Sequence, residues 1–165
     1  MASARNLRGT TMNNISVGLS LGTTSTYSTA ASSQSSIGGK FSTALTAQTN
    51  AASPAVDAGT GLAFVPLAAN QATVLVWGAN LAGAIQLTQG TIVPTATGVG
   101  TAAGAFLNAP QFPALPDNFC PLAYTLVRTS PTGNAFTAGV TSWTASGITT
   151  ATQNLCNLPD RPQIV

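Results

Sequence analysis

The sequence contains very little charge. Charged residues make up 5% of its 165 residues, and histidine and glutamate are both absent, whereas an ordinary soluble domain contains about 25% charged residues. Without histidine the chain cannot form a Ser-His-Asp triad, a Cys-His pair or a histidine-bearing zinc site. Acid–base chemistry would fall to Lys40, a few tyrosine and cysteine side chains, and the aspartates Asp57, Asp117 and Asp160. We therefore expect a protein that is not an enzyme and that holds no metal and no cofactor.

The few positive charges are scattered along the chain. The net charge is +2, and only Arg5 and Arg8 approach the basic stripe that nucleic-acid binding requires. The longest clear apolar run, residues 74–77, is far too short to span a membrane. Polar residues follow the N-terminal arginines, where a secretory signal has an apolar segment. We expect neither a nucleic acid nor a membrane as partner.

Two segments superficially similar to parts of catalytic or cofactor sites are better explained as turns and loops. Asp57 is followed by Ala58 and Gly59, a combination typical of turns. The glycines of residues 98–104 lack the spacing of a dinucleotide-binding loop, and the prolines that follow interrupt the helix such a loop requires. We predict a turn at the first segment and a glycine-rich loop at the second.

Apolar and polar residues alternate in several short segments, which is the pattern of a pleated strand. No amphipathic helix of ordinary length is indicated. Residues 73–77 are apolar on both faces, so we expect a central strand covered on both sides. The pattern predicts an all-β fold, with a β-sandwich or jelly-roll-like domain over residues 40–165. The expected strands cover residues 15–21, 40–49, 62–67, 73–77, 84–88, 91–93, 120–128 and 148–156.

The first 39 residues are expected to form an extended N-terminal arm. Residues 22–39 are dominated by serine, threonine and alanine, which offer little apolar surface to offset the entropy of ordering. They are either a flexible linker or an extended segment ordered against a neighbouring subunit. Alternation places four apolar residues of the arm on one strand face, which could join the sheet edge of a neighbour. The candidate interaction residues are Arg5, Arg8, Ile15, Val17, Leu19 and Leu21.

The strand at residues 120–128 is expected to pair with the last strand in an antiparallel manner. We predict a register with Tyr124 opposite Thr152 and Cys120 opposite Cys156. In that register the two cysteines could form a disulfide. The alternative is two small buried thiols, as expected for assembly in the cytoplasm.

Three aromatic residues, Trp77, Tyr124 and Trp143, are candidates for the core or for a subunit interface. Trp77 ends the strand that is apolar on both faces, and Tyr124 lies on one face of an alternating strand. An alternative is that Trp77 and Trp143 form an exposed platform on which sugar rings stack.

Several segments of the sequence resemble small virion proteins of tailed bacteriophages. Such proteins are often head decoration (cement) proteins, which sit on the lattice of the major capsid protein, commonly as trimers, and stabilise the expanded shell. The resemblance extends over residues 62–156 and carries over no functional residue. The similar segments are residues 64–71 (Phe-Val-Pro-Leu-Ala-Ala-Asn-Gln), 112–117 (Phe-Pro-Ala-Leu-Pro-Asp), 121–127 (Pro-Leu-Ala-Tyr-Thr-Leu-Val) and 132–139 (Thr-Gly-Asn-Ala-Phe-Thr-Ala-Gly).

The resemblance implies a capsid decoration protein that is made in the host cytoplasm and located on the exterior of the capsid. Its partners would be the major capsid protein and further copies of itself, in a homotrimer. The low charge agrees with this, because a protein covered by neighbours needs less polar surface. Two alternatives remain: another virion component, such as a head fibre or tail protein, and a carbohydrate-binding adhesin module.

Overall fold

The fold consists of short β-strands joined by turns and loops. The structure, a computed structural model, describes residues 11–156 together with Pro159 and Pro162. No helix occurs in this part of the chain, so the expected all-β fold is confirmed. The strands are β1 (Met12–Asn13), β2 (Leu19–Leu21), β3 (Thr26–Thr29), β4 (Ser35–Ile37), β5 (Lys40–Phe41), β6 (Gln48–Ala52), β7 (Gln71–Ala79), β8 (Ile85–Gln89), β9 (Val93–Pro94), β10 (Cys120–Thr129) and β11 (Ile148–Asn154).

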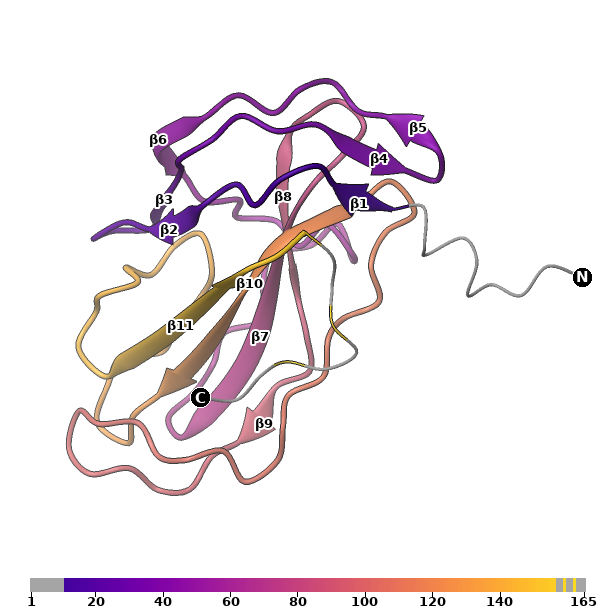
Figure 1. Cartoon of the computed structure of the whole chain (residues 1–165). Coiled ribbons are helices and arrows are strands. Elements are labelled where there is room, and N and C mark those ends of the chain that lie inside the picture. Colours follow the sequence, from indigo (N-terminus) through magenta and orange to yellow (C-terminus); the bar gives the residue numbers. More distant parts are fainter. Residues whose placement is uncertain (1–10, 157–158, 160–161, 163–165) are drawn as a thin grey trace, which may run out of the picture.

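The largest element is an antiparallel sheet of five strands. Its order is β11-β10-β7-β8, and β9 pairs with the start of β7 (Figure 1). β7 therefore runs through the middle of the sheet, and its residues 72–79 are all buried. The expectation that residues 73–77 form a central strand is confirmed, because a strand that is apolar on both faces is stable only when both faces are covered.

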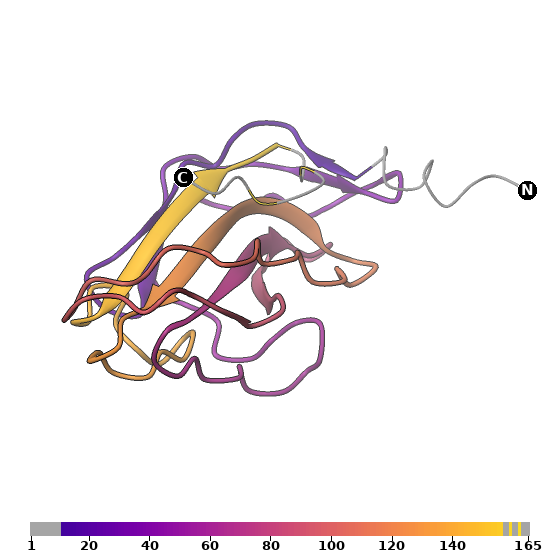
Figure 2. The same cartoon turned by 90° about the horizontal axis from the view of Figure 1, so that it is seen from below.

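The N-terminal part of the chain adds a second layer of strands. It forms two three-stranded sheets, with the orders β2-β3-β6 and β1-β4-β5. Seen from below, these strands lie on one side of β10 and β11, while long loops lie on the other side (Figure 2). The two layers are consistent with the expected β-sandwich, and the jelly-roll connectivity stays a prediction.

The larger hydrophobic core lies between the two layers. Leu75, Trp77 and Leu87 of the large sheet belong to the same buried cluster as Val17 and Tyr27 of the N-terminal part. Complete burial of a large apolar side chain contributes about 1.5–3 kcal/mol to stability. The N-terminal strands are therefore part of the hydrophobic core of the chain itself.

The expectation of an extended arm over residues 1–39 needs correction for residues 11–39. The β4–β5 hairpin, in which Ser36 pairs with Phe41, crosses the expected boundary between residues 39 and 40. In the same layer, the Asn154 side chain accepts a hydrogen bond from Leu19 N–H at 2.6 Å and donates one to Leu19 C=O at 3.0 Å. The serine- and threonine-rich segment is ordered because distant parts of its own chain satisfy its backbone groups.

A second, smaller core covers the opposite face of the large sheet. Val76, Tyr124 and Leu126 belong to it, and loop residues such as Phe112 and Phe119 cover them. The rings of Tyr124 and Phe112 meet edge to face, with centroids 5.3 Å apart. Tyr124 is thus a core residue.

The pairing of β10 with β11 differs by one residue from the expected register. Thr125, and not Tyr124, lies opposite Thr152, while Tyr124 lies opposite Gln153. A shift of one residue turns every side chain of a strand to the other face of the sheet. Thr152 therefore points to the same side as Thr125, and their hydroxyl oxygens are 2.9 Å apart.

The same shift separates the two cysteines. Leu155 N–H donates to Leu122 C=O, and the next pair in this register places Cys156 opposite Pro121 rather than opposite Cys120. Because neighbouring residues of a strand point to opposite faces, the two sulfur atoms do not converge. Both thiols are free, and Cys120 is buried whereas Cys156 is exposed.

A thiol reagent is expected to modify Cys156 in the native protein and Cys120 only after unfolding. Burial raises the pKa of the Cys120 thiol, an effect that a hydrogen bond with Ser35 partly opposes, so little of the reactive thiolate forms. Mass spectrometry after iodoacetamide treatment, with and without guanidinium chloride, measures both reactions. Equal native labelling of the two cysteines, or protection of both until a reductant is added, would contradict this assignment.

Candidate interaction surfaces

The described titratable groups do not come together as a reactive site. Asp57 is held in a turn, because Gly59 N–H donates to its Oδ1 at 2.8 Å, and the expected turn is thus confirmed. Lys40 and Asp117 are exposed at the surface. Within residues 11–156, 159 and 162, no group of three or more histidine, cysteine, aspartate or glutamate residues could hold a metal ion. In the same residues, no helix is long and apolar enough to cross a membrane.

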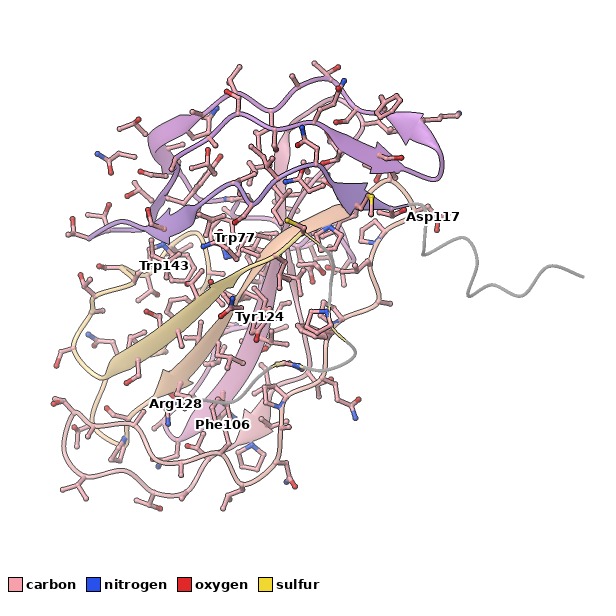
Figure 3. The ribbon with its side chains drawn as sticks, viewed as in Figure 1. Trp77, Phe106, Asp117, Tyr124, Arg128 and Trp143 are labelled. Carbon is pink, nitrogen blue, oxygen red and sulfur yellow. The ribbon has the colours of Figure 1, made fainter. Side chains whose placement is uncertain are left out.

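Trp77 and Trp143 lie in the core and not on the surface. Their side chains are 0% and 2% exposed, and the centroids of their rings are 5.9 Å apart. Figure 3 shows both side chains where the N-terminal strands meet the large sheet. Tyr27 packs against Trp77 and Phe136 against Trp143, each with ring centroids 5.2 Å apart. Because these rings are covered, they offer no platform for stacking sugar rings.

The Arg128 side chain is bound to a neighbouring loop of the chain itself. Its Nη1 donates to Gly104 C=O at 3.1 Å, and its guanidinium carbon lies 5.1 Å from the centroid of the Phe106 ring (Figure 3). These contacts attach the loop between β9 and β10 to the large sheet. The Arg128 guanidinium therefore interacts with a carbonyl group and an aromatic ring of its own chain.

The expected interaction residues of the arm are not brought together at one surface. Arg5 and Arg8 lie outside the described residues. Val17 and Leu19 are buried in the larger core, and Leu21 is half-buried against it. Ile15 is exposed, but it precedes β2 and does not lie in a strand. The segment that was expected to join the sheet of a neighbouring subunit instead packs in the N-terminal layer of its own chain.

A different apolar surface is exposed on two loops that the sequence did not single out. Three of its residues, Val56, Leu62 and Val65, lie in the loop between β6 and β7, and Val140 lies in the loop between β10 and β11. Their exposed fractions are 53%, 69%, 60% and 69%. We call these four residues the loop surface.

The two loops that carry the loop surface are held side by side. Leu67 and Phe136 exchange two backbone hydrogen bonds, of 2.8 and 3.1 Å. Gly139 has a φ of 73°, and a Cβ atom at this position would lie 2.6 Å from the Cα atom of Ala55. Glycine is therefore required both for the backbone conformation and for the close approach of the loops. The loop surface is built on fixed backbone.

The loop surface has no charge of its own. Asp57 is the sole charged residue in the loop between β6 and β7, its side chain is 7% exposed, and the loop between β10 and β11 has none. The Gln89 side chain bonds the N–H and the C=O of Val65, at 2.9 and 3.0 Å, so the backbone there is also satisfied. Exposed apolar side chains on adjacent, fixed loops that carry no exposed charge indicate an interaction site.

A smaller exposed apolar pair lies on the β1-β4-β5 sheet. Met12 and Phe41 both pair with Ser36 across this sheet, so their side chains share one face. Both are exposed. This face is thus a second, minor apolar area on the N-terminal layer.

The chain matches no known protein family, no curated protein and no solved structure. The functional argument therefore depends on the chain's own composition and surfaces.

Proposed function

We propose that the chain is a virion structural protein, and specifically a capsid decoration (cement) protein. It would bind the major capsid protein lattice on the exterior of the head and stabilise the shell. The observation that carries the proposal is the loop surface, an uncharged set of exposed apolar side chains on fixed backbone. A partner surface that covers it must itself be apolar and preformed, as at interfaces between permanent neighbours.

The strength of such a contact suits a repeated lattice. Complete burial of one large apolar side chain contributes about 1.5–3 kcal/mol, so covering four partly exposed ones contributes a few kcal/mol. A single contact of this size is weak. Many copies that each bridge neighbouring capsid subunits hold the shell strongly, because the contacts act together.

The scarcity of charge and the free cysteines support two further features of the proposal, self-association and synthesis in the cytoplasm. With 5% charged residues, the chain has few surface charges to keep molecules apart, so we propose association with further copies, as a homotrimer, as well as with the capsid. Two free cysteines fit synthesis in the reducing cytoplasm of a host cell. The mechanism would be mechanical, with no enzymatic step and no cofactor, nucleic acid or membrane.

A head fibre or tail protein would use the same kind of surface and is the alternative role within a virion. The number of copies per particle separates the two roles, because a lattice offers hundreds of equivalent positions and a tail only a few. A carbohydrate-binding adhesin is less well supported, since Trp77 and Trp143 are buried.

Replacing Val65 with aspartate is expected to weaken binding to capsid shells by about tenfold, because a carboxylate would have to lose its water against an apolar surface. The Val65 side chain is exposed, so the change leaves the core intact. Empty shells of the phage that carries the gene, prepared without this protein, would be mixed with the purified variants and sedimented. The bound protein in the pellet is then measured at several concentrations.

The matched control is Val99→Asp. Val99 is 84% exposed and lies in a different loop, between β9 and β10. Binding of this variant should equal that of the wild type. Equal loss in both variants would point to general charge repulsion, and no loss in Val65→Asp would remove the loop surface from the interface.

A further inference from the structure

The large sheet has two edges, and the residues that the structure describes cover one of them more fully than the other. On the β8 side, Ala58 N–H donates to Leu87 C=O at 2.9 Å, and the Gln89 side chain bonds the backbone of Val65. On the opposite side, β11 is the last strand of the sheet (Figure 1). Asn154 attaches β2 at one end of β11, and no other backbone hydrogen bond reaches the outer edge of residues 149–153 from the described part of the chain.

The hydrogen bonds beside β11 show which of its residues face outward. Leu155 N–H donates to Leu122 C=O, so this is a hydrogen-bonded pair of the β10–β11 ladder. Hydrogen-bonded and non-hydrogen-bonded pairs alternate along an antiparallel ladder. Thr150 and Thr152 therefore direct their N–H and C=O groups away from β10. These backbone groups have no partner among the residues that the structure describes.

The sequence and the ladder of β11 lack the features by which proteins usually protect a free edge. Such edges are shortened, bulged, or furnished with charges or proline to prevent pairing with another chain. β11 is seven residues long, Ile-Thr-Thr-Ala-Thr-Gln-Asn, without charge, proline or glycine, and its ladder with β10 has no register shift. An uncharged, extended strand with β-branched residues is a good partner for another strand of the same kind.

We propose that β11 pairs with β11 of a second copy of the chain, antiparallel and about a twofold axis at Ala151. Thr150 would then lie opposite Thr152 of the partner subunit, and each would exchange backbone hydrogen bonds with the other. The open backbone groups of both strands are satisfied in this arrangement. The two large sheets become one continuous sheet across the dimer.

The residue at the axis fits this geometry. Ala151 would face its own copy in a non-hydrogen-bonded pair, where the Cα atoms approach to about 4.5 Å. Its side chain is small and exposed, so the residue itself allows this close approach. The loop surface lies at the opposite, β8 edge of the sheet, because the loop between β6 and β7 covers that edge. The pairing of β11 with β11 therefore uses a different edge of the sheet from the proposed capsid contact. It would add to the contacts of a homotrimer.

Replacing Ala151 with glutamate is expected to halve the mass of the associated protein and to raise the dissociation constant roughly fivefold to tenfold. The reason is that two like charges would face each other at the axis. Sedimentation equilibrium over a range of concentrations measures both quantities. The matched control is Ala52→Glu, because Ala52 is an exposed alanine in β6. The associated mass of this variant should equal that of the wild type.

Two further measurements make the test specific to this pairing. A mixture of Ala151→Glu and Ala151→Lys chains should regain the wild-type mass, because opposite charges then meet at the axis. The Thr150 and Thr152 amides should be protected from hydrogen exchange in the wild type and exchange quickly in the Ala151→Glu variant. A monomeric wild type, an unchanged mass of Ala151→Glu, or fast exchange of both amides in the associated wild type would overturn the proposal.

Discussion

Replacing Trp77 with alanine is expected to lower the free energy of unfolding by roughly 3–5 kcal/mol. The side chain is 0% exposed, and its ring packs against those of Tyr27 and Trp143, with centroids 5.2 and 5.9 Å away. Its Nε1 also donates a hydrogen bond to Thr125 Oγ1 at 3.0 Å. Alanine would leave a cavity where the two layers meet and an unused hydroxyl acceptor inside it. Urea denaturation followed by circular dichroism measures the loss.

Two control variants separate these contributions. Trp77→Phe keeps one six-membered aromatic ring and loses the Nε1 hydrogen bond with the rest of the indole, so its effect should be smaller than that of alanine. Leu107→Ala removes an exposed side chain and should change stability by less than about 0.5 kcal/mol. If Trp77→Ala were no more destabilising than Leu107→Ala, Trp77 would not be at the centre of the core.

Deleting residues 1–39 is expected to abolish cooperative folding. The deletion removes β1–β4, and with them Val17, Leu19 and Tyr27 from the larger core. Each of these side chains contributes about 1.5–3 kcal/mol when buried, and a domain of this size has a total stability of about 5–15 kcal/mol. The face of the large sheet around Trp77 would also become exposed to water. Thermal unfolding monitored by circular dichroism is the direct measurement.

A shorter deletion provides the control. Removing residues 1–10 leaves in place every contact that the structure describes, so this variant should unfold cooperatively. If the chain without residues 1–39 also unfolded cooperatively at the wild-type temperature, the N-terminal strands would be an appendage and not a layer of the fold.

The central strands could be predicted from the sequence because their own residues determine their position. β7 is apolar on both faces and β10 is nearly so, and both lie in the middle of the sheet. The register of β11 could not be predicted in the same way. Its threonine-rich sequence has no apolar stripe to show which face is buried, and a shift by one residue leaves the pattern almost unchanged.

The N-terminal layer was missed because its stability comes from distant pairings. Its strands are two to five residues long, and β3 is fixed by β6, with Thr26 opposite Ala52. Local composition in this segment indicates little order, since serine and threonine contribute little apolar area. Hydrogen bonds such as those between Asn154 and Leu19 have no signal in a single sequence.

The loop surface could not be recognised either. Val56, Leu62, Val65 and Val140 are ordinary apolar residues, and the sequence does not distinguish a valine in a core from one at a surface. Their exposure depends on how the pairing of Leu67 with Phe136 places two loops side by side. The sequence signal that could have indicated them is the absence of charge around large apolar residues in glycine- and alanine-rich loops.

The copy number of the protein in purified virus particles tests the proposed function most directly. If the proposal is right, the gene belongs to a phage. Particles of that phage would be analysed by quantitative mass spectrometry, with the major capsid protein as internal standard, and imaged by electron cryomicroscopy. A decoration protein predicts a copy number close to that of the major capsid protein and density on the outer surface of the head. A few copies at the tail, or none in the particle, would contradict it.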